Sequence, residues 1–379
     1  MKVEPKQFIR RIAKNLRGYR TNRKIVVIES DDWGSIRMPS RDVYEKCLKA
    51  GYRVDKIAYE KYDSLASEND LELLFDVLSS FKDKMNKHPV LTANIIVANP
   101  DFEKIKKDNF REYHYELVTE TFKKYPEHSN NLNLWMDGLK NGLFFPQSHG
   151  REHLNVSEFM SDLKNHDKDL IFAVNHGMPG IIPYGNANRK GNSYVEALRY
   201  HSCDDKFEKL KIVLDGLNHF EEIFGYCSES FIPNNYFWSP DFDKYISQHG
   251  VKYYQGNRKM REIQLDGSKK FHTHYLGKKN KNGQYYLVRN AVFEPSLHKL
   301  KIKDPVSKCI SDISAAFIMK KPAIICSHRV NYVGYIDKTN RDKNLKLLEE
   351  LLKQILKKWN DVEFMNSVEL GHLIGSKRK

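Results

Sequence analysis

The stretch Lys24–Gly34, KIVVIESDDWG, decides the fold and carries the first chemically informative groups. Its four apolar residues, Ile25–Ile28, form the short continuous run that is typical of a strand buried in a parallel sheet. Two aspartates, Asp31 and Asp32, follow at the end of this strand. Adjacent carboxylates repel each other, and a metal ion on one of them would offset the repulsion and leave the other free as a base. An aspartate cap before a helix is the alternative explanation.

Outward from this stretch, strand and helix patterns alternate along the chain. The predicted strands are 24–29, 89–98, 143–147, 170–174, 229–233, 251–255, 322–326 and 362–365. The predicted helices are 70–81, 115–125, 132–139, 156–165, 206–224, 241–249, 306–319, 340–359 and 368–374. This alternation predicts parallel strands joined by crossover helices, and hence an α/β barrel or a doubly wound sheet.

Two segments interrupt the alternation, and we interpret them as insertions. Residues at about 175–200 are rich in Gly, Pro and Asn, which indicates a long loop. Residues at about 265–295 alternate polar and apolar around Asn282 and Gly283, a hairpin signal. We expect residues 1–23 to form a basic N-terminal helix, with an apolar face that packs on the protein or lies on an anionic surface, and residues 24–379 to form a single domain.

The composition narrows the class of protein and its partners. With 63 Lys and Arg against 49 Asp and Glu, the net charge is +14, which suits acidic partners. No phosphate-binding glycine loop or nucleic-acid motif accompanies this charge, so no nucleic-acid partner is expected. The five cysteines are scattered without a CxxC pair, which indicates reduced thiols and no sulfur-ligated zinc. Without a signal-like segment or an apolar run of about 18 residues, a cytoplasmic location is expected.

A second group of chemically informative residues follows the predicted strand 143–147. The motif HGREH places His149 and His153 four residues apart. On a helical turn both imidazoles would point the same way and reach one ion, although paired surface histidines are the alternative. Together with Asp32 they would make a set of three ligands, which leaves coordination positions open for water and substrate.

A third group follows the predicted strand 322–326, where His328 stands two residues beyond the apolar run. In a metal hydrolase this histidine could protonate a leaving group, whereas a lone histidine more often has a structural role. The ends of parallel strands converge in an α/β barrel, and this convergence favours a shared site for the three groups.

These three motifs resemble those of NodB-type polysaccharide deacetylases, that is, carbohydrate esterase family 4 and its relatives in the glycoside hydrolase/deacetylase barrel superfamily. The family has Asp-Asp-Gly after its first strand, then His-x-x-x-His, then an apolar strand that leads to a histidine. The same order runs across about residues 24–330 here, as in a distant member. The resemblance implies an α/β fold, namely an irregular (β/α) barrel of NodB-deacetylase type with loop and hairpin insertions.

The resemblance also implies a role for each matching residue. Asp31 matches the general base and His328 the catalytic acid. Asp32, His149 and His153 match the ligands of one divalent metal ion, for which zinc is the first expectation and Co, Ni, Mn or Fe the alternatives.

Several features depart from the family pattern. Trp33 stands where the family has glycine, and the segment 230–238 lacks the arginine that steadies the base. Arg258 or Arg151 could replace that arginine. The Asp-x-x-Trp pattern of the fourth motif is not recognisable around residues 255–257. The candidate substrate-binding residues are Trp33, Arg151, Asn235, Trp238 and Arg258, and Tyr236 and Phe237 are further aromatic candidates for stacking on sugar rings.

The resulting hypothesis is a metal-dependent hydrolase that removes acetyl groups from a polysaccharide or amino sugar. A metal-activated water would attack, with an aspartate base and a histidine acid, and the expected partner is an acetylated glycan or amino-sugar substrate. Two alternatives remain: a glycoside hydrolase on a related barrel, and a non-catalytic metal- or carbohydrate-binding domain.

Overall fold

A parallel sheet forms the centre of the protein in a computed structural model that describes residues 5–182, 184, 194–297 and 304–376. The strand order is β10-β7-β6-β5-β2-β1-β12-β11, and β13 also pairs with β1. These strands are β1 (Lys24–Trp33), β2 (Leu91–Ile95), β5 (Phe144–Ser148), β6 (Ser230–Phe231), β7 (Tyr253–Gly256), β10 (Tyr285–Val288), β11 (Ala291–Val292), β12 (Ala323–His328) and β13 (Val362–Phe364). The apolar run in β1 is buried on both faces, as the sequence predicted.

The two edges of this sheet meet at a seam. β10 and β11 lie at opposite ends of the strand order, yet only Arg289 and Asn290 separate them in the chain. The amide N–H of Arg289 donates to the carbonyl of Gly256 on β7, next to one edge, and that of Asn290 donates to the carbonyl of Ile324 on β12, next to the other. The sheet therefore curls until its edges are joined by a two-residue link, and the irregular (β/α) barrel expected from the sequence is confirmed.

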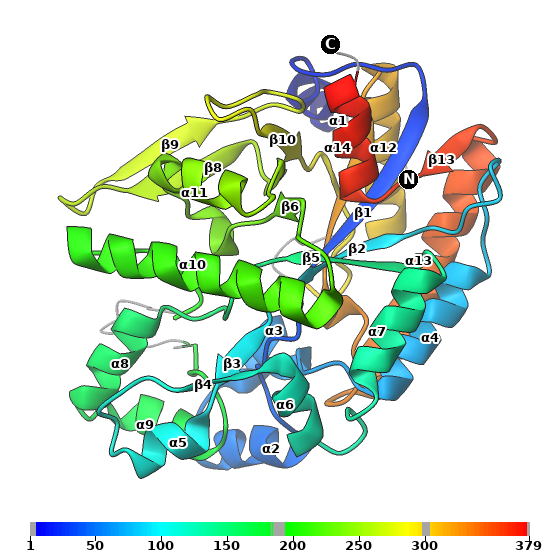
Figure 1. Cartoon of the computed structure of the whole chain (residues 1–379). Helices are drawn as coiled ribbons and strands as arrows, with labels where there is room; N and C mark the ends of the chain where they lie inside the picture. The colour runs from blue at the N-terminus through cyan, green and yellow to red at the C-terminus, as the bar shows by residue number, and fades with distance from the viewer. Residues whose placement is uncertain (1–4, 183, 185–193, 298–303, 377–379) are drawn as a thin grey trace.

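Helices cover the outside of this barrel (Figure 1). They are α1 (Pro5–Lys14), α2 (Arg41–Lys49), α3 (Ala58–Tyr62), α4 (Glu68–Ser79), α5 (Phe102–Lys107), α6 (Val118–Lys124), α7 (Asn131–Lys140), α8 (Val156–Lys164), α9 (Lys168–Asn175), α10 (Cys203–Phe224), α11 (Asp243–Gln248), α12 (Pro305–Ile318), α13 (Lys338–Lys358) and α14 (Ser367–Ser376). Short 3-10 turns include Val54–Lys56, Asn234–Tyr236, Pro240–Phe242 and Arg329–Asn331. The largest apolar core joins β1, β2 and β12 to α4, α7, α12 and α13.

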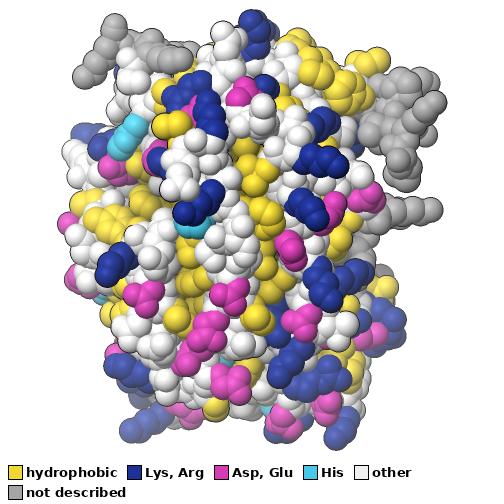
Figure 2. Space-filling model, turned by 90° about the vertical axis from the view of Figure 1, so that its right-hand side faces the viewer, with side chains coloured by type: hydrophobic (Ala, Val, Ile, Leu, Met, Phe, Trp, Pro, Cys, Tyr) yellow, Lys and Arg dark blue, Asp and Glu magenta, His cyan; other side chains and the backbone are white. Residues whose placement is uncertain are grey.

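The N-terminal helix packs on the protein. Arg11 of α1 pairs with Asp312 of α12 at 2.8 Å, and both side chains are largely buried. None of the described helices has both the length and the apolar composition that a membrane crossing requires. On the face drawn in Figure 2, basic side chains are interspersed with acidic ones, so the positive surplus does not gather there into one patch.

Two predictions of local secondary structure were wrong. Residues 170–174 belong to helix α9, because Asp167 caps its N-terminus and Leu170, Ala173 and Val174 recur at helical spacing on a buried face. A short apolar run of this length does not by itself distinguish a buried strand from a helix. Residues 115–117 form strand β4 (Tyr115–Leu117), which pairs with β3 (Ala98–Pro100) before α6 begins.

The hairpin signal at Asn282 and Gly283 is confirmed over a short length, since Lys279 and Tyr285 form an antiparallel bridge across this turn. A longer antiparallel hairpin precedes it, formed by β8 (Lys259–Ile263) and β9 (Lys269–Thr273), and it turns around Gly267, which has a left-handed φ of 80°. The turn at Asn282 and Gly283 leads into β10. β10 then pairs in parallel with β7, so this strand is part of the central sheet. In the predicted loop at about 175–200, residues 183 and 185–193 lie outside the described residues.

Candidate metal centre and active site

A bulge in β1 allows the side chains of both aspartates to face the same cavity. Consecutive residues of a regular strand point to opposite faces, but the pairing of β1 with β2 shifts between Ser30 and Trp33. Asp32 takes a φ of 73°, a left-handed conformation that is uncommon for a residue with a side chain. As a result Asp31 and Asp32 both line a cavity of about 110 Å³ at the carboxyl end of the strand.

The two histidines of the HGREH motif line the same cavity. They lie on an irregular loop after β5 and not on the helical turn that the sequence predicted. Gly150 allows the loop to turn, since its φ of 109° disfavours other residues. The loop packs against α10 at Gly216, where an added Cβ would lie 2.6 Å from the backbone nitrogen of Arg151.

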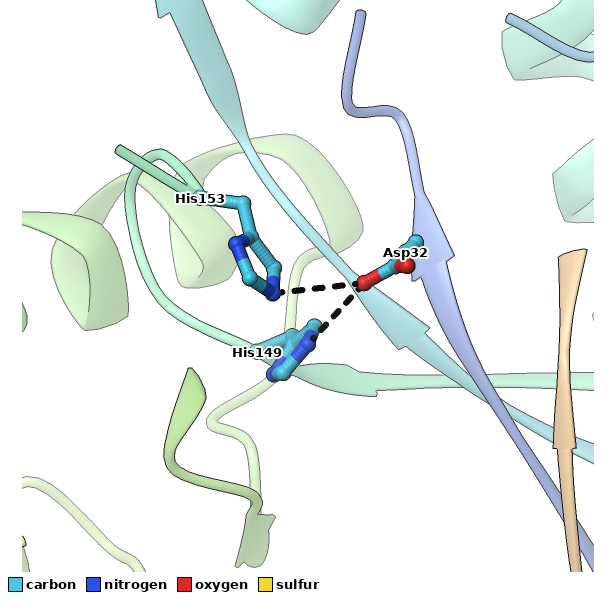
Figure 3. A group of neighbouring side chains, drawn as sticks. All are labelled: Asp32, His149 and His153. Carbon is cyan, nitrogen blue, oxygen red and sulfur yellow. Dashed lines mark ion pairs between the residues drawn. The ribbon is translucent and has the colours of Figure 1, made fainter. Parts of the chain in front are cut away.

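The three residues form a ligand set that fits one divalent ion. The Nε2 atoms of His149 and His153 lie 3.4 and 3.5 Å from the same oxygen of Asp32 (Figure 3). The candidate ligand atoms all lie within 4.8 Å of one another. His149 Nδ1 donates to the carbonyl of Ile232 at 2.8 Å, which leaves the lone pair of Nε2 facing Asp32.

The protonation states of this set also suit a metal. Burial disfavours the charge of Asp32, but the hydrogen bond with His149 and the positive charge of Arg37 favour it, and the pKa of the carboxyl is held well below its ordinary value. Burial lowers the pKa of His153 to about 3, so its imidazole is neutral. An ionised carboxylate and a neutral imidazole are the forms that bind metal ions.

Asp31 is held by an arginine that the sequence argument did not identify. Arg289 forms a two-pronged bond with it, Nη2 to Oδ1 at 2.6 Å and Nη1 to Oδ2 at 2.7 Å, and its Nε donates to Glu29 at 2.6 Å. Asn94 donates a further bond to Asp31 at 2.7 Å. Burial opposes the charge of Asp31, but Arg289 outweighs it and lowers the pKa of the carboxyl to about 2.

Neither arginine named from the sequence has this role. Arg151 binds Glu152 and Asp215 and so braces the histidine loop, while Arg258 is exposed. Arg289 was not predicted as a site residue because its segment has the sequence pattern of a hairpin insertion. Arg289 directly follows β10, and Asp31 lies near the end of β1, so both residues stand at the carboxyl end of a strand.

His328 is the third group to reach the cavity, from the end of β12. Its Nδ1 donates to Glu294 at 2.5 Å, and its Nε2 lies 3.6 Å from Asp31 Oδ2. Burial lowers the pKa of this imidazole, but the carboxylates of Glu294, Asp31 and Asp32 outweigh burial and raise it to about 9. His328 is therefore protonated at neutral pH. Glu294, like Arg289, was not identified from the sequence.

The predicted substrate-binding residues divide into two groups. Trp33 and Trp238 are buried in the core, where their indole N–H groups donate to Ser30 and Asp243. Phe237 is buried as well, so none of the three can stack on a sugar ring. Asn235 and Tyr236 do line the cavity.

Two unpredicted residues, Arg37 and Tyr59, also line this cavity. Tyr59 meets the ring of His328 edge to face at 5.8 Å between ring centroids. Arg37 Nη2 lies 3.5 Å from Asp32 Oδ2.

No model of a protein family matches the sequence, and no curated protein matches it. Among solved structures, a 4-alpha-glucanotransferase from Thermococcus litoralis matches 92% of this chain, which spans 40% of that protein, at 11% identity and a TM-score of 0.43. A probable polysaccharide deacetylase from Pseudomonas aeruginosa PAO1 (94% and 92% of the two chains) and an allantoinase (95% of each) match at 8% identity and a TM-score of 0.46. A peptidoglycan deacetylase from Bacillus subtilis also matches, over 94% of each chain, at 11% identity and a TM-score of 0.35.

Proposed function

We propose that the protein is a metal-dependent hydrolase that removes acetyl groups from a polysaccharide or amino sugar. The observation that carries this proposal is the convergence of Asp32, His149 and His153 on one point, with Asp31 and His328 in the same cavity. Two imidazoles and one carboxylate leave coordination positions open, as a catalytic metal site requires. A bound divalent ion, zinc in the first instance, would polarise the acyl carbonyl and lower the pKa of a water.

Asp31 has the properties of the general base. Arg289 and Asn94 fix its orientation and keep it ionised at neutral pH. It can therefore accept a proton from the attacking water at the moment when the water oxygen bonds to the acyl carbon. The low pKa of Asp31 makes it a weak base on its own, and it depends on a water that is already acidified.

His328 has the properties of the general acid. It is protonated at neutral pH, and Glu294 orients its ring through Nδ1 so that Nε2 faces the cavity beside Asp31. When the bond between the acyl carbon and the sugar nitrogen or oxygen breaks, Nε2 can give its proton to the leaving atom. His328 Nε2 lies 3.6 Å from Asp31 Oδ2, so the acid and the base can both reach one substrate in this cavity.

The first experiment is elemental analysis of the purified protein after incubation with Zn²⁺, Co²⁺, Ni²⁺, Mn²⁺ or Fe²⁺. One tightly bound ion is expected in the parent protein, and its loss is expected in His149→Ala. The control is His249→Ala, which removes a half-buried histidine that bonds only to its own helix. A parent protein that takes up no metal would overturn the proposal.

The second experiment is a screen for acetate release from N- and O-acetylated amino sugars and glycans by the metal-loaded protein. Acetate release that disappears in Asp31→Asn, while the metal stays bound, is the expected result. Release of reducing ends by metal-free protein would instead identify a glycoside hydrolase. Metal and glycan binding without any acetate would identify a binding domain.

A further inference from the structure

A second cavity adjoins the candidate site. Five apolar residues form a wall of this second cavity and do not line the first, namely Met38, Leu154, Met178, Pro179 and Ile181. Five residues line both cavities, namely Arg37, Tyr59, His153, Ile182 and Val195. The shared residues include a candidate metal ligand, so the apolar cavity begins where the reacting group would lie.

The size of this cavity exceeds what a single water needs. Its volume is about 50 Å³, whereas one water requires roughly 10–15 Å³. An acetyl group held at Asp32 and His153 has only its methyl group to place beyond the carbonyl carbon. It would leave most of the apolar wall without a partner, and unfilled space against such a wall forfeits dispersion contacts.

The one carboxyl group on the wall, that of Glu60, does not make the cavity strongly anionic. Its side chain is buried, and Oε1 accepts the N–H of Ile182 at 2.5 Å. Its other oxygen has no hydrogen-bond partner among the described residues. Burial raises the pKa of this carboxyl to about 7, so it is largely neutral in mildly acidic solution.

We infer that this cavity receives the apolar tail of an acyl group longer than acetyl, attached to the carbonyl that is hydrolysed at the Asp32, His149 and His153 site. The inference rests on the proposed function and names its substrate class as a fatty-acyl amide or ester of a sugar. Water adds its oxygen to the acyl carbon, the bond to the sugar nitrogen or oxygen breaks, and the sugar atom takes a proton. The products are a short fatty carboxylate and the free amino sugar or hydroxyl.

The test uses the carboxylate products, because their binding does not depend on which sugar is the substrate. The full-length protein is loaded with Co²⁺, whose visible spectrum reports a carboxylate at the metal. It is then titrated with acetate, butyrate and hexanoate. Each buried methylene contributes about 0.8 kcal/mol, or roughly fourfold in affinity, so butyrate should bind about 15-fold more tightly than acetate.

The variant Ile181→Trp fills the apolar cavity without altering a residue of the metal site. It should take up Co²⁺ and bind acetate as the parent protein does, yet lose most of the gain from acetate to butyrate. Ile318→Trp is the matched control, because Ile318 is 62% exposed on α12. It should retain the full gain with chain length.

Three results would contradict the inference, and they can be distinguished from one another. A parent protein that binds Co²⁺ and all three carboxylates with equal affinity would overturn the apolar-tail pocket and leave the proposed hydrolase intact. A parent protein that takes up no Co²⁺ would overturn the proposed function and the inference with it. Retention of the chain-length gain in Ile181→Trp would also refute the assignment of this cavity.

Discussion

The buried carboxyl of Glu60 provides a measurable consequence of the apolar cavity. Burial raises its pKa from 4.5 to about 7, against the smaller effects of the Ile182 N–H and of Arg37. An acid whose pKa is higher in the folded state contributes stability below pH 4.5, and this contribution is lost as the pH rises through 7. The full change is about 2.5 pKa units, or roughly 3.4 kcal/mol at 1.36 kcal/mol per unit.

The variant Glu60→Gln tests this reasoning, because the glutamine oxygen can still accept the N–H of Ile182 but carries no charge at any pH. Between pH 5 and pH 8 the linkage relation gives the parent protein a loss of about 2.5 kcal/mol that the variant does not share. Urea unfolding of both proteins at several pH values measures this difference directly. Parallel pH dependences in the two proteins would refute it, since they would show that Glu60 ionises as easily in the folded chain as in the unfolded one.

Three further perturbations follow from the site. Arg289→Met leaves two buried carboxylates without their partner, so it should lower the free energy of unfolding, measured in urea, by about 3–5 kcal/mol. The variant should also lose turnover but still take up metal. Wild-type turnover would exclude Arg289 from orienting the base. Glu294→Gln removes the main charge that raises the pKa of His328 above its ordinary value, so the alkaline limb of kcat/KM should move to lower pH; an unmoved limb would assign it to another group. Gly216→Ala would normally stabilise a helix by about 1 kcal/mol. Here the added Cβ would contact the histidine loop, so we expect the variant to lose its metal to a chelator more readily. Unchanged metal retention would show that the loop adapts.

Much of the candidate site could be predicted because its residues share one kind of position. Asp31, Asp32, His149 and His328 each follow or end an apolar strand, and the carboxyl ends of parallel strands lie at the same end of a barrel. The motifs and their order can be recognised in the sequence without knowledge of the path of the loops between them. Even where the helical geometry expected for His149 and His153 was wrong, the short spacing kept both rings within reach of one carboxylate.

The residues that orient the base and the acid could not be predicted from the sequence, because their positions depend on long-range strand pairing. Arg289 lies at the seam between the two edges of the sheet, and its position depends on how the whole barrel closes. Glu294 lies just beyond β11, in the same segment. Local alternation around Asn282 and Gly283 predicts a hairpin, and only pairing with β7 makes the following residues part of the central sheet. A pattern that is local in sequence does not contain this long-range information.

The position of β1 at the centre of the sheet has a consequence for folding during synthesis. β1 leaves the ribosome well before two of the strands that pair with it, β12 and β13. Asp31 and Arg289 are 258 residues apart, so their contact closes a very long loop. Until β12 and β13 emerge, the apolar run Ile25–Ile28 lacks these partners and has a high tendency to associate with other chains. We therefore expect nascent or C-terminally truncated chains to need protection from aggregation, and the candidate metal site to form only in the last stage of folding.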